Sequence, residues 1–208
     1  MNGLVLVVGF LAQTLFFARF LVQWILSEKA KRVLSPVIFW QLSIVASFLL
    51  FIYGWLRDDF AILLGQIIAY YIYIWNLKVQ NNWQKFNPTL QFIFLITPAV
   101  AIGWLLTDWQ NTVSRLFFNE GIPLPLLLWG TAGQIVFTFR FVYQWLYSRK
   151  RNESLLPGGF WLISISGATI ILSYAIFRLD PVLILGQGTG IFVYSRNLYL
   201  SRRAEQKA

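Results

Sequence analysis

Two arginines lie inside long apolar segments of this chain, where charged side chains are rare. Arg19 is followed one helical turn later by Gln23, and Arg140 is followed in the same way by Gln144. A charge at such depth in a bilayer is costly unless it faces water, a partner or a ligand. The planar guanidinium fork suits phosphate or carboxylate, and an amide one turn away can contact the same group. These residues therefore predict binding of an anionic ligand.

Both arginines belong to a longer pattern of polar and aromatic residues that occurs twice, at a constant spacing of about 121 residues. On a helical projection, the positions shared by the two copies fall on one face of each predicted helix. These faces supply amides and rings, which are groups suited to sugar hydroxyls and sugar faces. The predicted binding residues are Arg19, Gln23, Trp24, Gln13, Tyr73 and Asn76 in the first copy, and Arg140, Gln144, Trp145, Gln134, Tyr194 and Asn197 in the second.

The composition predicts a membrane protein. Of the 208 residues, 58% are hydrophobic and 12% are charged, whereas soluble domains carry about 25% charged residues. The chain contains no Cys and no His, which excludes disulfides, thiolate and imidazole catalysis and the usual zinc sites. No Asp or Glu lies inside a predicted span, so acid–base catalysis lacks its usual side chains. We expect no enzyme activity, no metal and no cofactor.

Seven segments are apolar and long enough to cross a hydrocarbon core of about 30 Å. Pro98, in the middle of the fourth, predicts a kink because it removes a backbone hydrogen bond. The predicted helices cover residues 4–26, 36–56, 60–77, 88–107, 123–147, 158–177 and 181–200. The predicted domains are a first three-helix repeat (1–80), a linker with the fourth helix (81–122), a second three-helix repeat (123–201) and a basic tail (202–208).

The fourth helix has no counterpart in either copy. Three crossings reverse the side of the membrane on which a chain emerges, so two triplets joined directly would be inverted relative to each other. One additional crossing makes the two triplets parallel. We therefore expect an all-α integral membrane fold with seven transmembrane helices, in which an inversion linker helix joins two parallel three-helix repeats.

Lys and Arg residues predict the orientation of the chain. The net charge is +9, and most of the basic residues fall in the loops after the first, third and fifth helices and in the C-terminal tail. By the positive-inside rule, the N-terminus lies outside and the C-terminus lies in the cytoplasm. The excess positive charge then reflects topology and contact with anionic lipid, and not binding of nucleic acid.

The repeated motifs resemble a known family. They read Arg-Phe-x-x-Gln-Trp-x-x-Ser from Arg19 and Arg140, Pro-x-x-Phe-Trp-x-x-Ser from Pro36 and Pro157, and Tyr-x-x-Asn-Leu from Tyr73 and Tyr194. This pattern is similar to the small membrane domain named for the N-terminus of certain lipid A disaccharide synthases. The resemblance covers everything except the fourth helix and the tails.

That family is related in fold to the PQ-loop and SWEET sugar transporters, which pair three-helix units in parallel through a linker helix. The resemblance thus implies the same layout, although neither copy contains a Pro-Gln dipeptide. The copies also differ: Arg196 is matched by Trp75, and Glu28 is matched by Arg149. No glycosyltransferase domain is present in this sequence, so disaccharide synthase activity is not expected.

Three functions remain open at this point. The first is a transporter or flippase that moves a phosphate-bearing lipid-linked sugar, such as a polyprenyl-phosphate sugar or a related envelope glycolipid, through a central arginine-lined cavity in the bacterial inner membrane. The family's association with envelope glycolipid synthesis implies the same class of ligand. The second is a SWEET-like facilitator of small soluble sugars. The third is an accessory subunit that does not transport and presents lipid to a membrane glycosyltransferase. Alternatively, the arginines are purely structural or extend to the interface.

Overall fold

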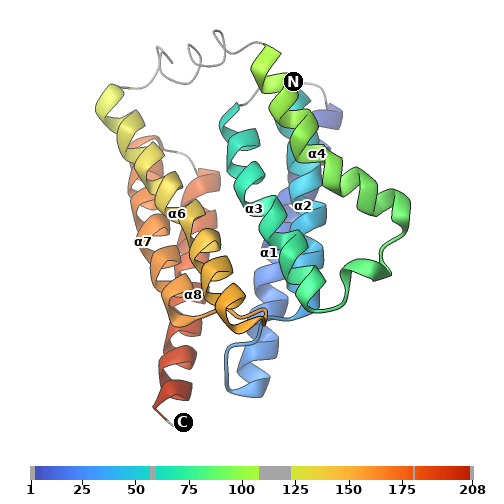
Figure 1. The fold of residues 1–208 in the computed structure, drawn as a ribbon. Coiled ribbons are helices and arrows are strands. Elements are labelled where there is room, and N and C mark those ends of the chain that lie inside the picture. Colours follow the sequence, from blue (N-terminus) through green and yellow to red (C-terminus); the bar gives the residue numbers. More distant parts are fainter. Residues whose placement is uncertain (1–2, 57–59, 108–122, 180, 207–208) are drawn as a thin grey trace. The chain divides into compact units, whose positions relative to one another are not determined.

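The computed structural model describes residues 3–56, 60–107, 123–179 and 181–206. Over these ranges the chain is helical apart from short connections, as Figure 1 shows. The α-helices are, in chain order, α1 (Gly3–Ala30), α2 (Val37–Leu56), α3 (Phe60–Val79), α4 (Pro88–Thr107), α6 (Leu124–Arg151), α7 (Gly158–Phe177) and α8 (Pro181–Glu205), and a 3-10 helix, η1 (Trp83–Lys85), precedes α4. The predicted all-helical class is therefore confirmed.

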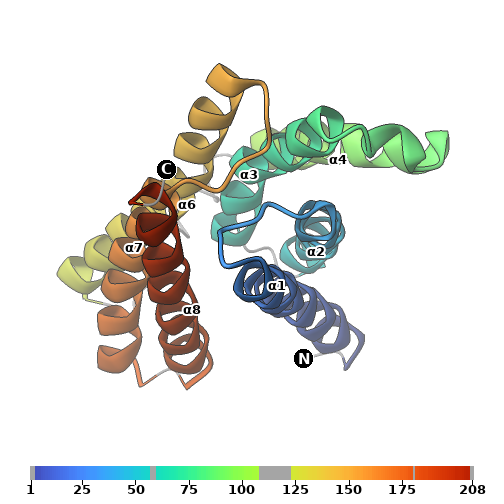
Figure 2. The same cartoon turned by 90° about the horizontal axis from the view of Figure 1, so that it is seen from below.

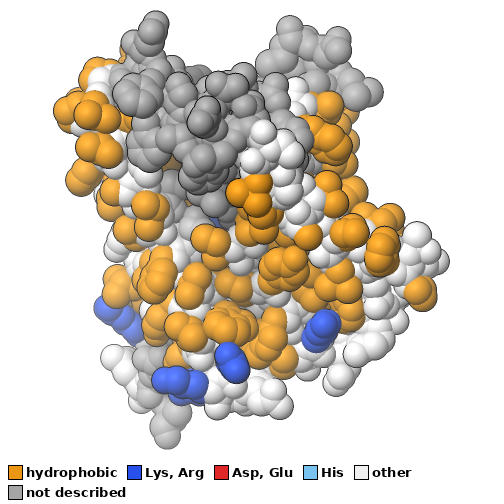
Figure 3. Space-filling model, turned by 45° about the horizontal axis from the view of Figure 1, so that its top comes forward, with side chains coloured by type: hydrophobic (Ala, Val, Ile, Leu, Met, Phe, Trp, Pro, Cys, Tyr) orange, Lys and Arg blue, Asp and Glu red, His pale blue; other side chains and the backbone are white. Residues whose placement is uncertain are grey.

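Three of these helices are long and apolar enough to cross a membrane. They contain the stretches Val7–Ala30 in α1, Leu124–Arg151 in α6 and Gly158–Phe177 in α7. Two shorter apolar stretches, Val37–Tyr53 and Pro88–Gly103, lie in α2 and α4. These apolar helices make the chain a multi-pass membrane protein. On the face drawn in Figure 3, apolar side chains cover a broad area, and most of the visible Lys and Arg side chains lie towards one end.

Three helices extend at least one full turn beyond their predicted C-terminal ends. α1, α6 and α8 continue through basic stretches that were expected to be loop or tail, and they end at Ala30, Arg151 and Glu205. Basic side chains are favourable in the last turn of a helix, because the helix dipole is negative there. After α6, Asn152 adopts a left-handed conformation (φ 50°, ψ 34°), and its N–H donates to the Arg149 and Ser148 carbonyls.

α4 contains Pro98 near its middle. Figure 1 shows that the helix changes direction along its length, in agreement with the kink predicted from the proline. The connection between α4 and α6, residues 108–122 of the predicted linker, lies outside the described residues.

By their contacts the residues form two compact units. Unit 1 comprises Met1–Val22 and Pro36–Glu120, and unit 2 comprises Gln23–Ser35 and Gly121–Ala208. Within unit 1, α2 packs on α3, and α4 contacts both helices. Within unit 2, α7 packs against both α6 and α8, as the view in Figure 2 also shows. The last turns of α1, from Gln23 onward, thus belong with α6, α7 and α8.

The first and second helices of each triplet approach closely at a glycine. A Cβ atom added to Gly9 in α1 would lie 2.7 Å from the Tyr53 ring in α2. A Cβ atom added to Gly130 in α6 would lie 2.8 Å from the Tyr174 ring in α7. Both distances are too short for a real contact, so each glycine lets a tyrosine pack against the neighbouring helix. The duplicated sequence therefore forms a duplicated packing contact.

Candidate functional site

Arg19 is buried in unit 1, where α1, α2 and α3 meet. Its side chain is 3% exposed. One terminal nitrogen, Nη1, donates to Ser43 Oγ at 2.8 Å and to the Tyr73 hydroxyl at 3.3 Å. The guanidinium carbon lies 4.5 Å from the centroid of the Phe16 ring and 4.7 Å from that of Phe20, both within the range of cation–π attraction. These hydroxyl groups and ring faces position the positive charge.

Arg140 occupies the equivalent place in unit 2, where it is also 3% exposed. Its guanidinium carbon lies 3.4 Å from the centroid of the Phe137 ring, 4.8 Å from that of Phe141 and 5.7 Å from that of Tyr194. The first two rings are the counterparts of the rings beside Arg19. Both arginines that the sequence singled out are therefore buried, one in each unit and each against aromatic faces.

A layer of fully buried rings supports each arginine. In unit 1, Trp40 packs edge-on against Phe39 with ring centroids 4.8 Å apart, and it contacts Tyr73 at 6.0 Å. In the second copy, the Trp161 ring lies 4.9 Å from that of Phe160 and 6.2 Å from that of Tyr194, measured between centroids. The tyrosine of this layer therefore contacts both the arginine and the tryptophan. Sequence reasoning did not include Trp40 or Ser43 among the site residues, although both occur in the repeated Pro-x-x-Phe-Trp-x-x-Ser motif.

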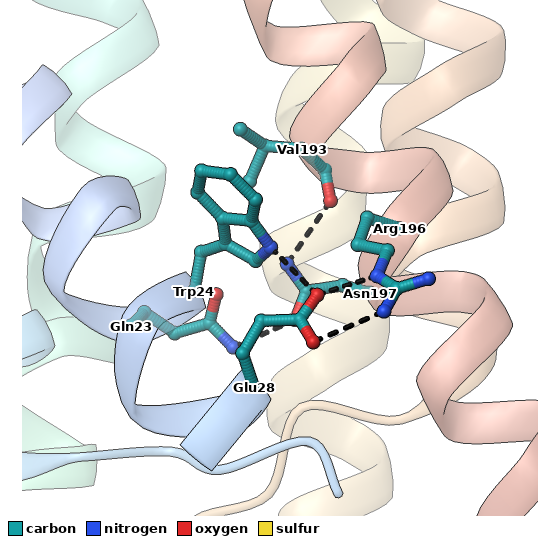
Figure 4. Close-up of polar contacts among 6 residues, drawn as sticks. All are labelled: Gln23, Trp24, Glu28, Val193, Arg196 and Asn197. Atoms are coloured by element: carbon teal, nitrogen blue, oxygen red, sulfur yellow. Dashed lines mark hydrogen bonds and ion pairs between the residues drawn. The ribbon is translucent and has the colours of Figure 1, made fainter. Parts of the chain in front are cut away.

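Gln23 is fully buried and belongs to unit 2. Its Nε2 lies within hydrogen-bonding distance of Ser27 Oγ (2.9 Å), the Leu34 carbonyl (3.2 Å) and Asn197 Oδ1 (3.0 Å). The amide of Asn197 in turn donates to the Val193 carbonyl at 3.0 Å, as Figure 4 shows. An amide nitrogen carries two protons, so it satisfies two of the three acceptors at a time. The contact joins two predicted site residues, one from each copy.

The glutamines also brace the loops that follow their helices. Gln144 Nε2 donates to Ser148 Oγ and to the Leu155 carbonyl, both at 2.9 Å. The Leu155 N–H donates back to Ser148 Oγ at 3.1 Å. Gln23 has the same serine and carbonyl contacts at the end of α1. The structure thus gives both amides contacts with the loops that follow α1 and α6.

The remaining predicted residues differ in exposure. Asn76, like Tyr73, Tyr194 and Asn197, is buried, and its side-chain amide donates to the Ile72 carbonyl at 2.8 Å. Trp24 and Trp145 are partly exposed, whereas Gln13 and Gln134 are exposed on α1 and α6. The structure therefore brings Arg19 together with Tyr73, Arg140 with Tyr194, and Gln23 with Asn197. Within the described ranges, no group of three or more Asp, Glu, His or Cys residues could hold a metal.

Comparisons with known proteins agree with the duplicated geometry. The family described as the Lipid A Biosynthesis N-terminal domain matches this chain twice, at residues 8–78 and 129–199. The chain is 33% identical over 196 residues to the lipid-A-disaccharide synthase of Chlamydia pneumoniae and 32% identical over 202 residues to that of Chlamydia felis (strain Fe/C-56).

These alignments cover 92% and 93% of this chain but 32% of each relative. The chain thus spans about a third of the length of the curated relatives it matches. No solved structure matches it. The two family matches coincide with the two sets of motifs, and each contains one of the two buried arginines. The chain is therefore a tandem duplication, and it belongs to the Lipid A Biosynthesis N-terminal domain family.

Proposed function

We propose that this protein binds a phosphate-bearing lipid-linked sugar, such as a polyprenyl-phosphate sugar or a related envelope glycolipid, and moves it across the bacterial inner membrane. The observation that supports this proposal is that the chain buries an arginine against equivalent phenylalanine rings twice, at Arg19 and at Arg140. A phosphate group supplies the negative charge that a guanidinium fork binds best.

The pocket chemistry supports a functional role for the arginines. Removing a guanidinium group from water costs several kcal/mol. Among the groups that contact Arg19 are Ser43, Tyr73 and the rings of Phe16 and Phe20, and a guanidinium fork placed on hydroxyl groups and ring faces is held in a defined position. Both copies nevertheless carry arginine. A role in recognising an anion accounts for the presence of a buried arginine at the same position of both copies.

The family supports the class of ligand. The curated relatives are named as lipid-A-disaccharide synthases, and a membrane domain that they share with this chain is a reasonable place to bind a lipid-linked sugar. In the described part of the chain, three α-helices precede α4 and three follow it, an order that supports two parallel repeats joined by an inversion linker. The basic C-terminal ends of α1, α6 and α8 support a cytoplasmic C-terminus and an outside N-terminus.

A second candidate is an accessory subunit that binds the same lipid and presents it to a membrane glycosyltransferase. The match to about a third of much longer synthases favours this alternative, because in those relatives the shared region accompanies further sequence. A facilitator of soluble sugars is less well supported, since a neutral sugar gives the two arginines no counter-charge. In all three cases the chain itself carries out no catalysis.

Reconstitution into liposomes distinguishes these functions. The probe is a radiolabelled polyprenyl-phosphate sugar, and the measurements are its binding and its appearance in the outer leaflet. Arg19→Ala with Arg140→Ala should reduce both by about tenfold or more, because each arginine loses a charge-assisted contact with phosphate. Arg202→Gln with Arg203→Gln, two exposed positions on α8, is the matched control and should behave as the wild type.

Two outcomes would favour the alternative functions, and a third would reject the arginine site. Binding without movement by the wild type would favour the accessory subunit. Uptake of a neutral soluble sugar that is indifferent to phosphate would favour the facilitator. Normal binding and movement of the lipid by the double alanine variant would show that the arginine pockets are not the binding site.

A further inference from the structure

Glu28 lies at an unfavourable position in α1. It occurs in the last turns of the helix, where the helix dipole is negative and repels a carboxylate. At the corresponding position near the end of α6 the chain has Arg149, whose charge suits that end of a helix. The carboxylate of Glu28 therefore needs a local partner that compensates for its position.

Arg196 in α8 is that partner. Its Nε donates to Glu28 Oε1, and its Nη2 donates to Oε2 at 3.1 Å, so the guanidinium contacts the carboxylate through two parallel hydrogen bonds (Figure 4). The indole N–H of Trp24, one turn earlier in α1, donates to Oε1 at 3.1 Å. Three donors thus hold one carboxylate, and they come from segments far apart in the sequence. A two-pronged arrangement of this kind is the strongest form of arginine–carboxylate contact.

The ion pair covers a buried contact between the same two helices. Gln23 and Asn197, joined at 3.0 Å, are both fully buried. The Trp24 ring packs edge-on against Phe192 of α8 at 5.9 Å. By contrast, the side chains of Glu28 and Arg196 are 31% and 44% exposed. The attachment of α1 to α8 in unit 2 therefore has a buried amide pair inside and an exposed ion pair outside.

The duplication does not repeat this ion pair. The surrounding motif residues are the same in both copies, but Glu28 is matched by Arg149 and Arg196 is matched by Trp75. The guanidinium carbon of Arg149 instead lies 5.2 Å from the centroid of the Trp145 ring. An arginine and a tryptophan cannot form an ion pair, so this sequence can build the contact at one of the two equivalent positions and not at the other.

We propose that Glu28, Trp24 and Arg196 form a one-sided latch, which holds the last turns of α1 on α8 and can open. An exposed ion pair is weak and is screened by salt, so it can break and re-form without unpacking an apolar core. When it breaks, water reaches the amide pair beneath it and the last turns of α1 lose their hold on α8. This inference goes beyond the proposed function and does not depend on any ligand.

Hydrogen exchange of the full chain, reconstituted in nanodiscs, tests the latch. The reporter is the peptide that covers residues 23–35. Glu28→Gln and Arg196→Gln should each speed its exchange by about three- to tenfold, as expected for loss of a well-aligned, partly exposed ion pair. The charge exchange Glu28→Arg with Arg196→Glu should return the rate towards that of the wild type. High salt should speed exchange in the wild type and have little effect in the two glutamine variants.

Arg149→Gln is the matched control, because it removes a charge from the equivalent position of the other copy. It should leave exchange of residues 23–35 unchanged, and peptides from α2 and α7 should exchange as in the wild type in every variant. Wild-type exchange in both glutamine variants would overturn the latch. Failure of the charge exchange to restore protection would overturn it as well, as would acceleration over the whole chain.

Discussion

Arg19 and Arg140 carry a positive charge among aromatic rings, about three helical turns from the basic C-terminal ends of α1 and α6. Burying an ion costs more than an apolar side chain of the same size, and replacing such groups by apolar residues is often neutral or stabilising. If the arginines serve to bind an anion, replacing them with an apolar residue should therefore lower ligand affinity without lowering the free energy of unfolding. If they serve to hold the fold together, the same replacement should lower both the ligand affinity and the free energy of unfolding.

Methionine tests this separation, because it is unbranched and nearly fills the space of the arginine stem. Arg19→Met should leave the free energy of unfolding unchanged or raise it by about 1 kcal/mol, since the cost of the buried charge disappears. Affinity for the polyprenyl-phosphate sugar should fall by about tenfold or more. Unfolding in detergent and lipid binding are the two measurements. Arg19→Lys, which keeps the charge but loses the fork, should bind at an intermediate level. A large loss of stability in Arg19→Met would instead assign the arginine to the fold.

The side-chain amides of Gln23 and Gln144 make contacts that could not be predicted from the sequence. Gln23 and Gln144 were predicted as ligand-binding residues because each lies one turn from an arginine. In the structure each also donates to a serine and to a carbonyl eleven residues further along the chain. The path of the loop decides which carbonyl comes into reach, and a helical projection contains no information about that path. The inward position of the arginines, in contrast, follows from the cost of exposing them to lipid.

At the scale of the elements, apolar length and proline positions predicted the starts of the helices well. The C-terminal ends of α1, α6 and α8 were predicted too early, because a polar and basic stretch resembles a loop in sequence. Its charges in fact favour continuation of the helix, since they complement the dipole. Where a helix stops here depends on which residue can adopt a left-handed backbone, as Lys31 and Asn152 do after α1 and α6, with φ values of 52° and 50°.

The paired glycines give a prediction about how these helices pack. Gly9→Ala and Gly130→Ala should each destabilise the protein by about 1 to 3 kcal/mol, because the new methyl group would overlap a tyrosine ring and force the helices apart. Thermal unfolding in detergent is the measurement. Gly188→Ala is the control: nothing lies within 4 Å of the added Cβ, and the first copy carries Ile67 at the same position. Equal stability of all three variants would mean that the close approach does not matter.

At the scale of the whole molecule, the duplication explains what the sequence could and could not predict. Equivalent phenylalanine rings lie beside Arg19 and Arg140, so what the motifs predicted for one copy could be applied to the other. Comparison of the two copies gives no information where their residues differ. They differ at Glu28, which is matched by Arg149, and at Arg196, which is matched by Trp75. The two residues are 168 positions apart. Only the folded chain shows that these two differences between the copies belong together, because Glu28 and Arg196 form an ion pair with each other.

The latch predicts how lipid movement should respond if the last turns of α1 must leave α8 during transport. The chain contains no cysteine, so Glu28→Cys with Arg196→Cys introduces a unique pair. A short bis-methanethiosulfonate reagent joins the two cysteines reversibly. Cross-linked protein should bind the polyprenyl-phosphate sugar but move it at least about tenfold more slowly, because the free energy of ligand binding cannot break a covalent cross-link.

Reduction of the cross-link should restore movement. Single-cysteine variants treated with the same reagent should keep moving lipid, and undiminished movement by the cross-linked protein would show that this end of α1 stays in place during transport.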